Sequence, residues 1–395
     1  MQIKCREYKT IVLSFKLFIF LIAFFLLPNC VNNSSLEKNQ PIHPIEIALL
    51  LPLESNSKKT NILSNDLVNS ARLAAQDLAH LNIVLSVYPT SGDKKRAVYA
   101  AKAAVQAGSQ IIIGPLFSDE TAAVKLALDK DQTKIISLSN DPRVAGKNVF
   151  IMGTTFETSA NRLVNFALSQ GLDRIAVIGP QENFGRNGIQ AAKEAIERNG
   201  AILTTNLSYP FSLKGIKKSA AKIYNGLKAS NSTAIIFTDS PTRGLGFITE
   251  QLSQIYYNEG EKPPQFMGLT RWDSTKQILH ESSLQKAWFV IPDQKFKKRY
   301  QERYTEAFGN KPSDNSWLSY DAIALIGGVL KKSRSATASN KFQKKHFLDQ
   351  KGFVGINGIF RFKADGRNER FVSIAEVNLG KYKIIDPAKN KFRAE

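Results

Sequence analysis

The stretch RIAVIGPQENFGRNGIQAAKEAIERNGA, residues 174–201, contains the pattern that decides the fold. It begins with a short apolar run, Arg174 to Ile178, and continues into a helical pattern from about Asn183 to Asn199. A second apolar run follows from Ile202 to Ser208. Short apolar runs that alternate with helical patterns are typical of parallel βαβ units. This stretch therefore predicts an α/β protein.

The same alternation extends in both directions along the chain. Before residue 174, strands are expected at 45–53, 83–88, 110–113 and 134–138, and helices at 64–81, 93–107 and 118–129. After residue 208, strands are expected at 234–238, 265–269 and 287–291, and helices at 216–228, 245–254, 294–308 and 315–331. Glycines at the junctions support these limits. The sequence thus predicts two doubly wound lobes, each with a parallel sheet.

The last part of the chain has a different pattern, from Gly352 to Ile385. Gly355, Gly358 and the Asp365-Gly366 pair stand between short alternating runs. Such turn residues between alternating runs are typical of β-hairpins. We expect these hairpins to close one of the lobes.

The composition favours a binding or structural role over catalysis. The chain has 395 residues, which suits two domains of roughly 150 residues or more. Two Cys exclude a disulfide framework and a Cys-rich metal site, and four scattered His leave little for His-based catalysis. The sequence predicts neither a metal nor a cofactor.

The chain is also basic, with 54 Lys and Arg against 34 Asp and Glu and a formal net charge of +20. The basic residues gather at 295–303, 331–334 and 341–345. Charge on an expected helix usually marks a solvated face, and the alternative is attraction to an anionic envelope surface or an acidic partner. Few aromatic residues are interleaved with these clusters, so no nucleic-acid partner is expected.

The N-terminus has the pattern of an export signal. Four basic residues precede the apolar run from Leu17 to Leu27, whose 11 residues are too few to span a bilayer. The run ends in Leu27-Pro28-Asn29-Cys30, which resembles a bacterial lipoprotein processing site, although that pattern prefers small residues before the Cys. We expect a signal peptide at 1–29, a tether at 30–44 and lipidation of Cys30, which would anchor the exported chain to a membrane in the periplasm. Cleavage elsewhere, or an uncleaved anchor, is the alternative.

Three stretches together resemble one family. They are IALLLPL at 47–53, GSQIIIGPLFSDETAA at 108–123 and the stretch at 174–201. They are similar to the type I periplasmic binding proteins, typified by leucine/isoleucine/valine receptors. The resemblance implies two lobes joined by three crossovers near 152–156, 290–293 and 351–354, with a ligand cleft at the carboxyl ends of the strands. It places 45–154 plus 292–351 in the N-terminal lobe and 155–291 plus 352–395 in the C-terminal lobe.

A narrower resemblance is carried by five further stretches. They are ISLSND at 136–141, GLTRWD at 268–273, AWFVIPD at 287–293, SYDAIAL at 319–325 and GFVGINGIFRFKADGRNERF at 352–371. They are similar to the penicillin-binding protein activators, lipoproteins of the same fold, which implies a non-catalytic envelope lipoprotein whose partner is a cell-wall synthase. The alternative is a substrate-binding protein that delivers an amino acid or similar small solute to an ABC permease. A purely structural envelope protein is a third class.

The family resemblance also implies ligand-binding residues. Ser118 matches a serine that holds a ligand carboxylate, while its place before an expected helix also suits an N-cap. Ser139 and Asp141 match residues that contact the ligand, while Asp141-Pro142 is also an ordinary turn initiator. Phe184 matches an aromatic residue that covers the ligand, and its alternative role is packing between the lobes.

One expected site residue departs from the family pattern. Amino-acid receptors present a carboxylate to the ligand ammonium just after the strand that matches 265–269, and here Thr270 stands in that place. Asp239 and Asp273 are the nearby acids that could substitute. Because a buried ammonium without a partner carboxylate is costly, we expect weaker binding of a free amino acid than in the receptors.

Enzyme motifs are incomplete. Ser-x-x-Lys occurs at 55–58, 91–94 and 283–286, and Ser313-Asp314-Asn315 is present, but no Lys-Thr-Gly completes a serine-transpeptidase set. The glycines form neither a Walker loop nor a dinucleotide fingerprint. We therefore expect no catalytic activity.

Overall fold

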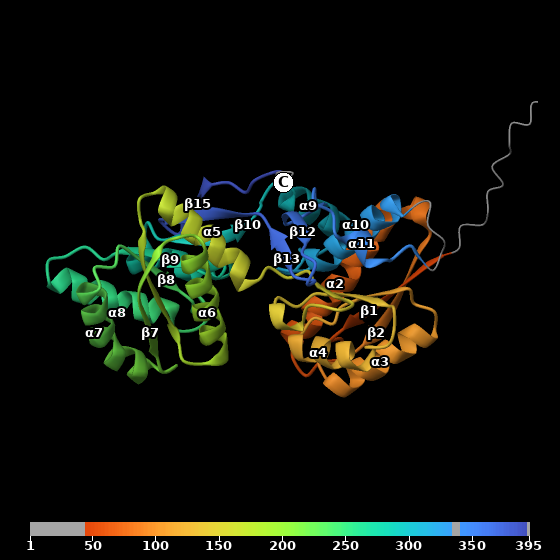
Figure 1. The fold of residues 1–395 in the computed structure, drawn as a ribbon, viewed down its shortest axis with the longest axis horizontal. Coiled ribbons are helices and arrows are strands. Elements are labelled where there is room, and N and C mark those ends of the chain that lie inside the picture. The colour runs from red at the N-terminus through yellow and green to blue at the C-terminus, as the bar shows by residue number, and fades with distance from the viewer. Residues whose placement is uncertain (1–43, 334–339, 393–395) are drawn as a thin grey trace, which may run out of the picture. The chain divides into compact units, whose positions relative to one another are not determined.

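Two mainly parallel sheets carry the fold of residues 44–333 and 340–392, the residues that the computed structural model describes (Figure 1). The predicted α/β class, with two doubly wound lobes, is confirmed. The interpretations made for residues 1–43, including Cys30, concern residues outside this described part. None of the described helices is long and apolar enough to cross a membrane.

The first sheet has five parallel strands in the order β2-β1-β3-β4-β5. Its strands are β1 (Ile45–Leu51), β2 (Ile83–Pro89), β3 (Ile111–Ile113), β4 (Lys134–Ser137) and β5 (Val149–Ile151). Its helices are α2 (Lys58–Asp77), η1 (Ala79–Leu81), α3 (Lys94–Gln106), α4 (Ser118–Ala127), η2 (Pro142–Val144), α9 (Lys297–Phe308), α10 (Trp317–Lys332) and α11 (Lys344–Phe347). In Figure 1, α3 and α4 lie on one side of β1 and β2, and α2 and α10 lie on the other. Because both faces are covered, Leu49 and Leu50 are both fully buried although they point to opposite faces.

The second sheet has seven strands in the order β15-β14-β10-β9-β8-β6-β7. Its strands are β6 (Arg174–Pro180), β7 (Ile202–Tyr209), β8 (Ala234–Phe237), β9 (Gln265–Gly268), β10 (Trp288–Pro292), β14 (Val372–Asn378) and β15 (Lys381–Asp386). Its helices are α5 (Phe156–Ser169), α6 (Asn183–Arg198), α7 (Leu213–Ala229), α8 (Leu245–Asn258), η3 (Trp272–Ser274), η4 (Lys276–His280) and η5 (Ser282–Leu284). The strands β6 to β10 are parallel to one another, and β14 and β15 extend the sheet as antiparallel strands.

Two elements around the first crossover were not expected from the sequence. The strand β5 has only three residues, and α5 begins at Phe156, where the family resemblance implied a crossover strand. Thr155 starts this helix, because its side chain accepts a hydrogen bond from the backbone N–H of Thr158 at 3.2 Å. The first crossover is therefore a short link between Ile151 and Thr155.

The C-terminal tail divides between the two lobes, which corrects the expected boundary at residue 352. The strands β11 (Phe353–Gly355), β12 (Gly358–Phe362) and β13 (Asn368–Arg370) form a separate antiparallel sheet. Its Phe353, Phe360 and Phe362 are buried in the core of the first lobe, and the Phe362 ring lies 5.0 Å from the Phe150 ring of β5. Only β14 and β15 join the second sheet. Turn residues predict a hairpin but do not say which sheet it packs on, and the phenylalanines decide that.

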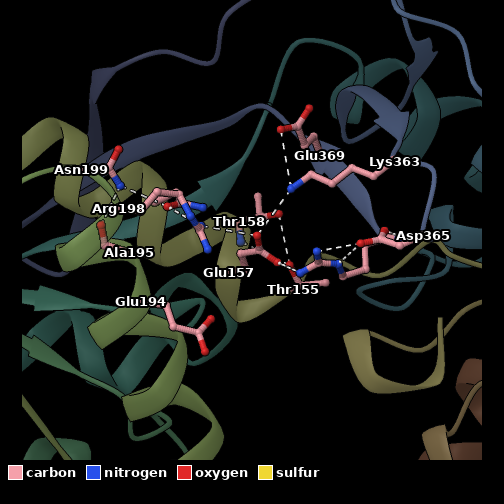
Figure 2. A network of polar contacts seen from close by, with 12 residues as sticks. Thr155, Glu157, Thr158, Glu194, Ala195, Arg198, Asn199, Lys363, Asp365 and Glu369 are labelled. Atoms are coloured by element: carbon pink, nitrogen blue, oxygen red, sulfur yellow. Dashed lines mark hydrogen bonds and ion pairs between the residues drawn. The ribbon is translucent and has the colours of Figure 1, made fainter. Parts of the chain in front are cut away.

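The third crossover consequently lies between β13 and β14, at Phe371, and not near 351–354. It runs beside the first crossover, because the Asn368 side chain donates hydrogen bonds to the backbone oxygens of Ile151 at 2.7 Å and Gly153 at 2.9 Å. A polar network connects the same region to the second lobe (Figure 2). There Glu157 of α5 accepts from Arg367 at 2.9 Å and from Lys363 at 3.4 Å, both in the turn between β12 and β13.

A buried ion pair lies next to the third crossover. Arg370 and Asp321 of α10 both have fully buried side chains, and their charged groups are 3.5 Å apart. Arg370 also donates to the backbone oxygen of Met152 at 3.3 Å, and its guanidinium lies 4.5 Å from the Phe360 ring centre. The pair thus joins α10, the hairpin sheet and the first crossover.

Candidate functional site

A cavity of about 490 Å³ lies at the carboxyl ends of strands from both sheets. Ser139 follows β4 of the first sheet, while Phe184 and Thr270 follow β6 and β9 of the second, and all three line the cavity. Gly153 and Thr154 of the first crossover and Phe156 of α5 line it as well. Ligands of open α/β sheets generally bind at the carboxyl ends of the strands. The cavity is large enough for a small organic molecule.

Three of the predicted residues, Ser139, Phe184 and Thr270, are therefore brought together. The Ser139 oxygen accepts the backbone N–H of Asp141 at 3.1 Å, which leaves its hydroxyl hydrogen free to be donated. The Thr270 hydroxyl donates to the backbone oxygen of Asp239 at 3.1 Å. The Phe184 ring packs edge to face on Phe156, with centres 5.1 Å apart. Together they offer hydroxyl groups beside an aromatic wall.

Ser118 and Asp141 do not line the cavity. Ser118 is the first residue of α4, and the N-cap is Phe117, which does line the cavity, so the N-cap interpretation of Ser118 is wrong. Asp141 starts the η2 turn and pairs with Arg143 at 2.6 Å. The Arg143 hydrogen bonds hold the pKa of the Asp141 carboxyl below its ordinary value. The structure therefore gives Asp141 the role of a turn initiator.

Asp239 is fully buried and organises the loop after β8. It accepts hydrogen bonds from the Tyr209 hydroxyl at 2.7 Å and from the backbone N–H groups of Ser240 at 2.8 Å and Gly244 at 3.1 Å. Burial, reinforced by Asp239, raises the pKa of Tyr209, so this phenol stays a donor. Asp239 is not a lining residue, and its oxygens are already used. It is therefore not placed to pair with a ligand ammonium.

The second candidate acid, Asp273, is also occupied. Arg271 donates to its two oxygens at 3.0 and 2.6 Å, and the same guanidinium lies 3.7 Å from Asp314 in the loop before α10. Burial opposes the charge on Arg271, but the hydrogen bonds to Asp273 and the nearby Asp314 outweigh it and raise the pKa of this guanidinium. Among the described lining residues, Asp314 is the only acid and Arg271 the only base.

Sequence reasoning missed four lining residues of functional interest, namely Arg271, Asp314, Trp317 and Asn357. Arg271 directly follows Thr270 in the sequence, so its position just after a strand could have identified it as a lining residue. Asn357 gave none, because the hairpin that carries it was assigned to the other lobe. Trp317 and Asp314 lie at the start of α10, whose approach to the second lobe no local pattern predicts.

The Arg271–Asp314 pair yields a first prediction. Asp314→Asn is expected to change the free energy of unfolding by no more than about 1 kcal/mol, because the Asp314 side chain is 55% exposed and exposed ion pairs contribute little. Urea unfolding of the variant and the wild type measures this difference. A loss of more than about 2 kcal/mol would show that the pair is a structural support of the fold.

The polar groups of the cavity lining are mostly uncharged. Its described lining contains hydroxyl, amide and aromatic groups and no His, Cys or Lys. Over residues 44–333 and 340–392, no group of three or more His, Cys, Asp or Glu side chains is placed to hold a metal ion.

Comparisons with known proteins agree with this geometry. Residues 44–383 match the model of a family described as periplasmic binding protein. An uncharacterized protein of Rickettsia prowazekii (strain Madrid E) is 21% identical over 350 residues, which are 86% of this chain and 88% of that protein.

Two solved structures share the fold at lower identity. An ABC transporter substrate-binding protein from Desulfitobacterium hafniense in complex with Leu has a TM-score of 0.63 at 16% identity, with 87% of this chain and 100% of the other covered. A solute-binding protein of an R. palustris ABC transporter in complex with benzoate has a TM-score of 0.61 at 13% identity, with 88% and 97% covered. Because the family match covers most of the sequence, this chain belongs to the periplasmic binding protein family.

Proposed function

We propose that this protein is an exported solute receptor that binds a small carboxylate with an apolar body and works with an ABC permease. The observation that carries the proposal is the cavity of about 490 Å³, which is unfilled by side chains and has no unpaired acid among its described lining. An amino-acid receptor needs such an acid for the ligand ammonium, because an unpaired buried ammonium is strongly unfavourable. A ligand without an ammonium avoids that cost.

The lining supports an apolar ligand body. Leu116, Leu138 and Leu269 line the cavity beside the rings of Phe156 and Phe184. Burial of apolar surface contributes about 25 cal/mol per Å². The proteins compared above bind leucine and benzoate, two carboxylates with apolar bodies, and only leucine carries an ammonium. The cavity of the present chain suits the chemistry that these two ligands share.

Isothermal titration calorimetry of the purified protein with paired ligands tests this proposal. Isocaproate is leucine without its amino group. We expect it to bind at least about ten times more tightly than leucine, because it lacks the ammonium that would be buried without a partner. Benzoate is expected to bind as well. Tighter binding of leucine, or no binding of any of the three, would contradict the proposal.

Thr270 provides a variant that should reverse the preference. Thr270→Asp is expected to raise the affinity for leucine by about tenfold or more and to lower that for isocaproate, because a carboxylate at the cavity wall pairs with an ammonium and repels a second carboxylate. Thr270→Asn is the matched control, since it has the same shape without the charge. If both variants changed leucine binding equally, charge at this position would not control the preference.

A second candidate function, regulation of a cell-wall synthase, is supported by the stretches at 136–141, 268–273, 287–293, 319–325 and 352–371. Much of this likeness lies on packing residues, since Trp272, Asp321 and Arg370 are all buried. It therefore gives little information about an outer surface that would contact a synthase. The rate of glycan polymerisation by a purified penicillin-binding protein, with and without this protein, tests the candidate, and an unchanged rate would exclude that enzyme as the partner.

Lipid anchoring through Cys30 is part of the proposed function. A lipidated Cys30 would hold the receptor close to a membrane permease. Mass spectrometry of the mature N-terminus tests it, and we expect a diacylglyceryl-modified Cys30 as the first residue. An N-terminus beyond residue 30, or an unmodified thiol, would contradict this part of the proposal.

A further inference from the structure

Asn357 is a buried donor at the cavity. It lies in the turn between β11 and β12, is only 4% exposed, and lines the cavity of about 490 Å³. Its Nδ2 has no hydrogen-bond partner among residues 44–333 and 340–392. A buried donor without a partner costs about 1 to 3 kcal/mol, so nearly all such groups in proteins are paired.

Asp321 and Arg370 both contact the backbone of the turn that carries Asn357. The N–H of the preceding Ile356 donates to Asp321 at 2.6 Å, and the backbone oxygen of Asn357 lies 3.5 Å from the Arg370 guanidinium. The following Gly358 has a φ of +96° and closes the turn, a conformation that glycine adopts without strain. The buried Arg370–Asp321 pair therefore fixes the backbone of Asn357 at the cavity wall.

The one cationic side chain among the described lining residues of the large cavity, Arg271, lies near this donor. Asn357, Arg271, Asp314 and Trp317 line both the large cavity and a small chamber of about 20 Å³ beside it, so these four residues lie close together. Asp273 and Asp314 already face Arg271, yet a guanidinium has five N–H donors and can bind a further oxygen. A carboxylate here would accept from an amide and lie beside a guanidinium.

We infer that Asn357 is a specificity-determining residue, whose Nδ2 donates to a carboxylate oxygen of the ligand beside Arg271. This inference rests on the proposed function and deepens it, since it names the group that selects the ligand's acidic end. It also gives a role to the hairpin sheet, which the expected lobe boundary had placed elsewhere. The hairpin contributes a recognition residue as well as core packing.

The test compares a carboxylate with its alcohol in three proteins. Isocaproate and isohexanol, which carry the same apolar body, are titrated by calorimetry into the wild type, Asn357→Leu and Asn357→Asp. In the wild type, isocaproate should bind more tightly than isohexanol. Asn357→Leu should reduce this preference by about tenfold or more, the usual range for losing a hydrogen bond to a charged group.

Asn357→Asp keeps the shape of the side chain and replaces the donor by an acceptor. It should lose isocaproate binding and retain isohexanol, whose hydroxyl can donate to the new carboxylate. Asn310→Leu is the control, because Asn310 is exposed and lies outside both cavities, and it should keep the wild-type preference. If Asn357→Leu does not fold, the affinities of Asn357→Asp for the two ligands test the inference by themselves.

The outcomes separate this inference from the proposed function. If the wild type binds isocaproate and both Asn357 variants keep the wild-type ratio of the two affinities, the inference is wrong and the receptor function stands. If the wild type binds neither isocaproate nor benzoate, the proposed function fails and the inference fails with it. A fall in both affinities by the same factor also overturns the inference, because it would reflect packing alone.

Discussion

Arg370→Met is expected to lower the free energy of unfolding by about 3 to 5 kcal/mol, the usual cost of removing one partner of a buried ion pair. The side chains of Arg370 and Asp321 are both fully buried, so the Asp321 carboxylate left behind cannot be hydrated without opening the core. The methionine has a similar apolar stem and can pack against Phe360. Urea unfolding measures the loss, and a change below about 1 kcal/mol would contradict the role given to this pair.

The loss of unfolding free energy in Arg370→Met should depend on pH. Burial raises the pKa of Asp321 to about 6, although Arg370 lowers it. In the unfolded chain the pKa of the same carboxyl has its ordinary value of about 4. The contribution of Asp321 to the free energy of unfolding is therefore fully present below about pH 4 and is lost as the pH rises through about 6. Without Arg370 the folded pKa rises further. The difference between Arg370→Met and the wild type should therefore be small at pH 5 and larger at pH 8.

A double variant provides the control. Arg370→Met combined with Asp321→Leu removes both charges and should recover much of the stability, since an apolar replacement of a buried pair is often neutral. The pH dependence should disappear as well. If the double variant is less stable than Arg370→Met, the hydrogen bond that Asp321 accepts from the backbone N–H of Ile356 contributes more than the unpaired charge costs.

Trp272→Ala is the second large effect, with an expected loss of about 3 to 5 kcal/mol. Trp272 is fully buried, and its indole stacks on Phe289 with ring centres 5.7 Å apart. It also packs on Gly268, where a Cβ would lie only 2.1 Å from the indole. Because Thr270 and Ser274 on either side line the cavity, the variant should also weaken binding of isocaproate.

Trp288→Ala is the matched control for this prediction. Trp288 is half-buried and packs edge to face on Phe166, with ring centres 4.8 Å apart. It does not line the cavity. In urea unfolding, Trp288→Ala should lower the free energy of unfolding by less than Trp272→Ala does. It should leave the affinity for isocaproate unchanged. Equal losses for the two tryptophans would contradict the supporting role of Trp272.

The strands and most helices were predictable because their signals are local. Runs such as Ile111 to Ile113 are buried on both faces and are therefore continuously apolar, which the sequence displays directly. The equally short β5 was not expected, because only the η2 turn, and no helical pattern, separates it from β4. The hairpin at 353–370 was recognised, but its lobe was not, because the packing of Phe360 against the first core is a long-range contact.

The candidate site was predictable only where position along a strand decides it. Ser139 and Thr270 each follow a strand by two residues, Phe184 is the second residue of the helix after β6, and all three line the cavity. Asp239 follows its strand in the same way, yet it turns toward Tyr209 and the loop backbone. Side-chain direction at a loop depends on partners that are distant in sequence. Asn357 is the extreme case, since its place at the cavity depends on a buried ion pair.

The fluorescence of Trp317 gives the most direct test of the central claim, that a small carboxylate binds in this cavity. Of the three tryptophans in the chain, only Trp317 lines the cavity, so a ligand there should change its emission. Titration of the wild type with isocaproate is expected to give a saturable change, and Trp317→Phe should lose most of it while remaining folded. No saturable change in the wild type, or the same change in Trp317→Phe, would contradict the account.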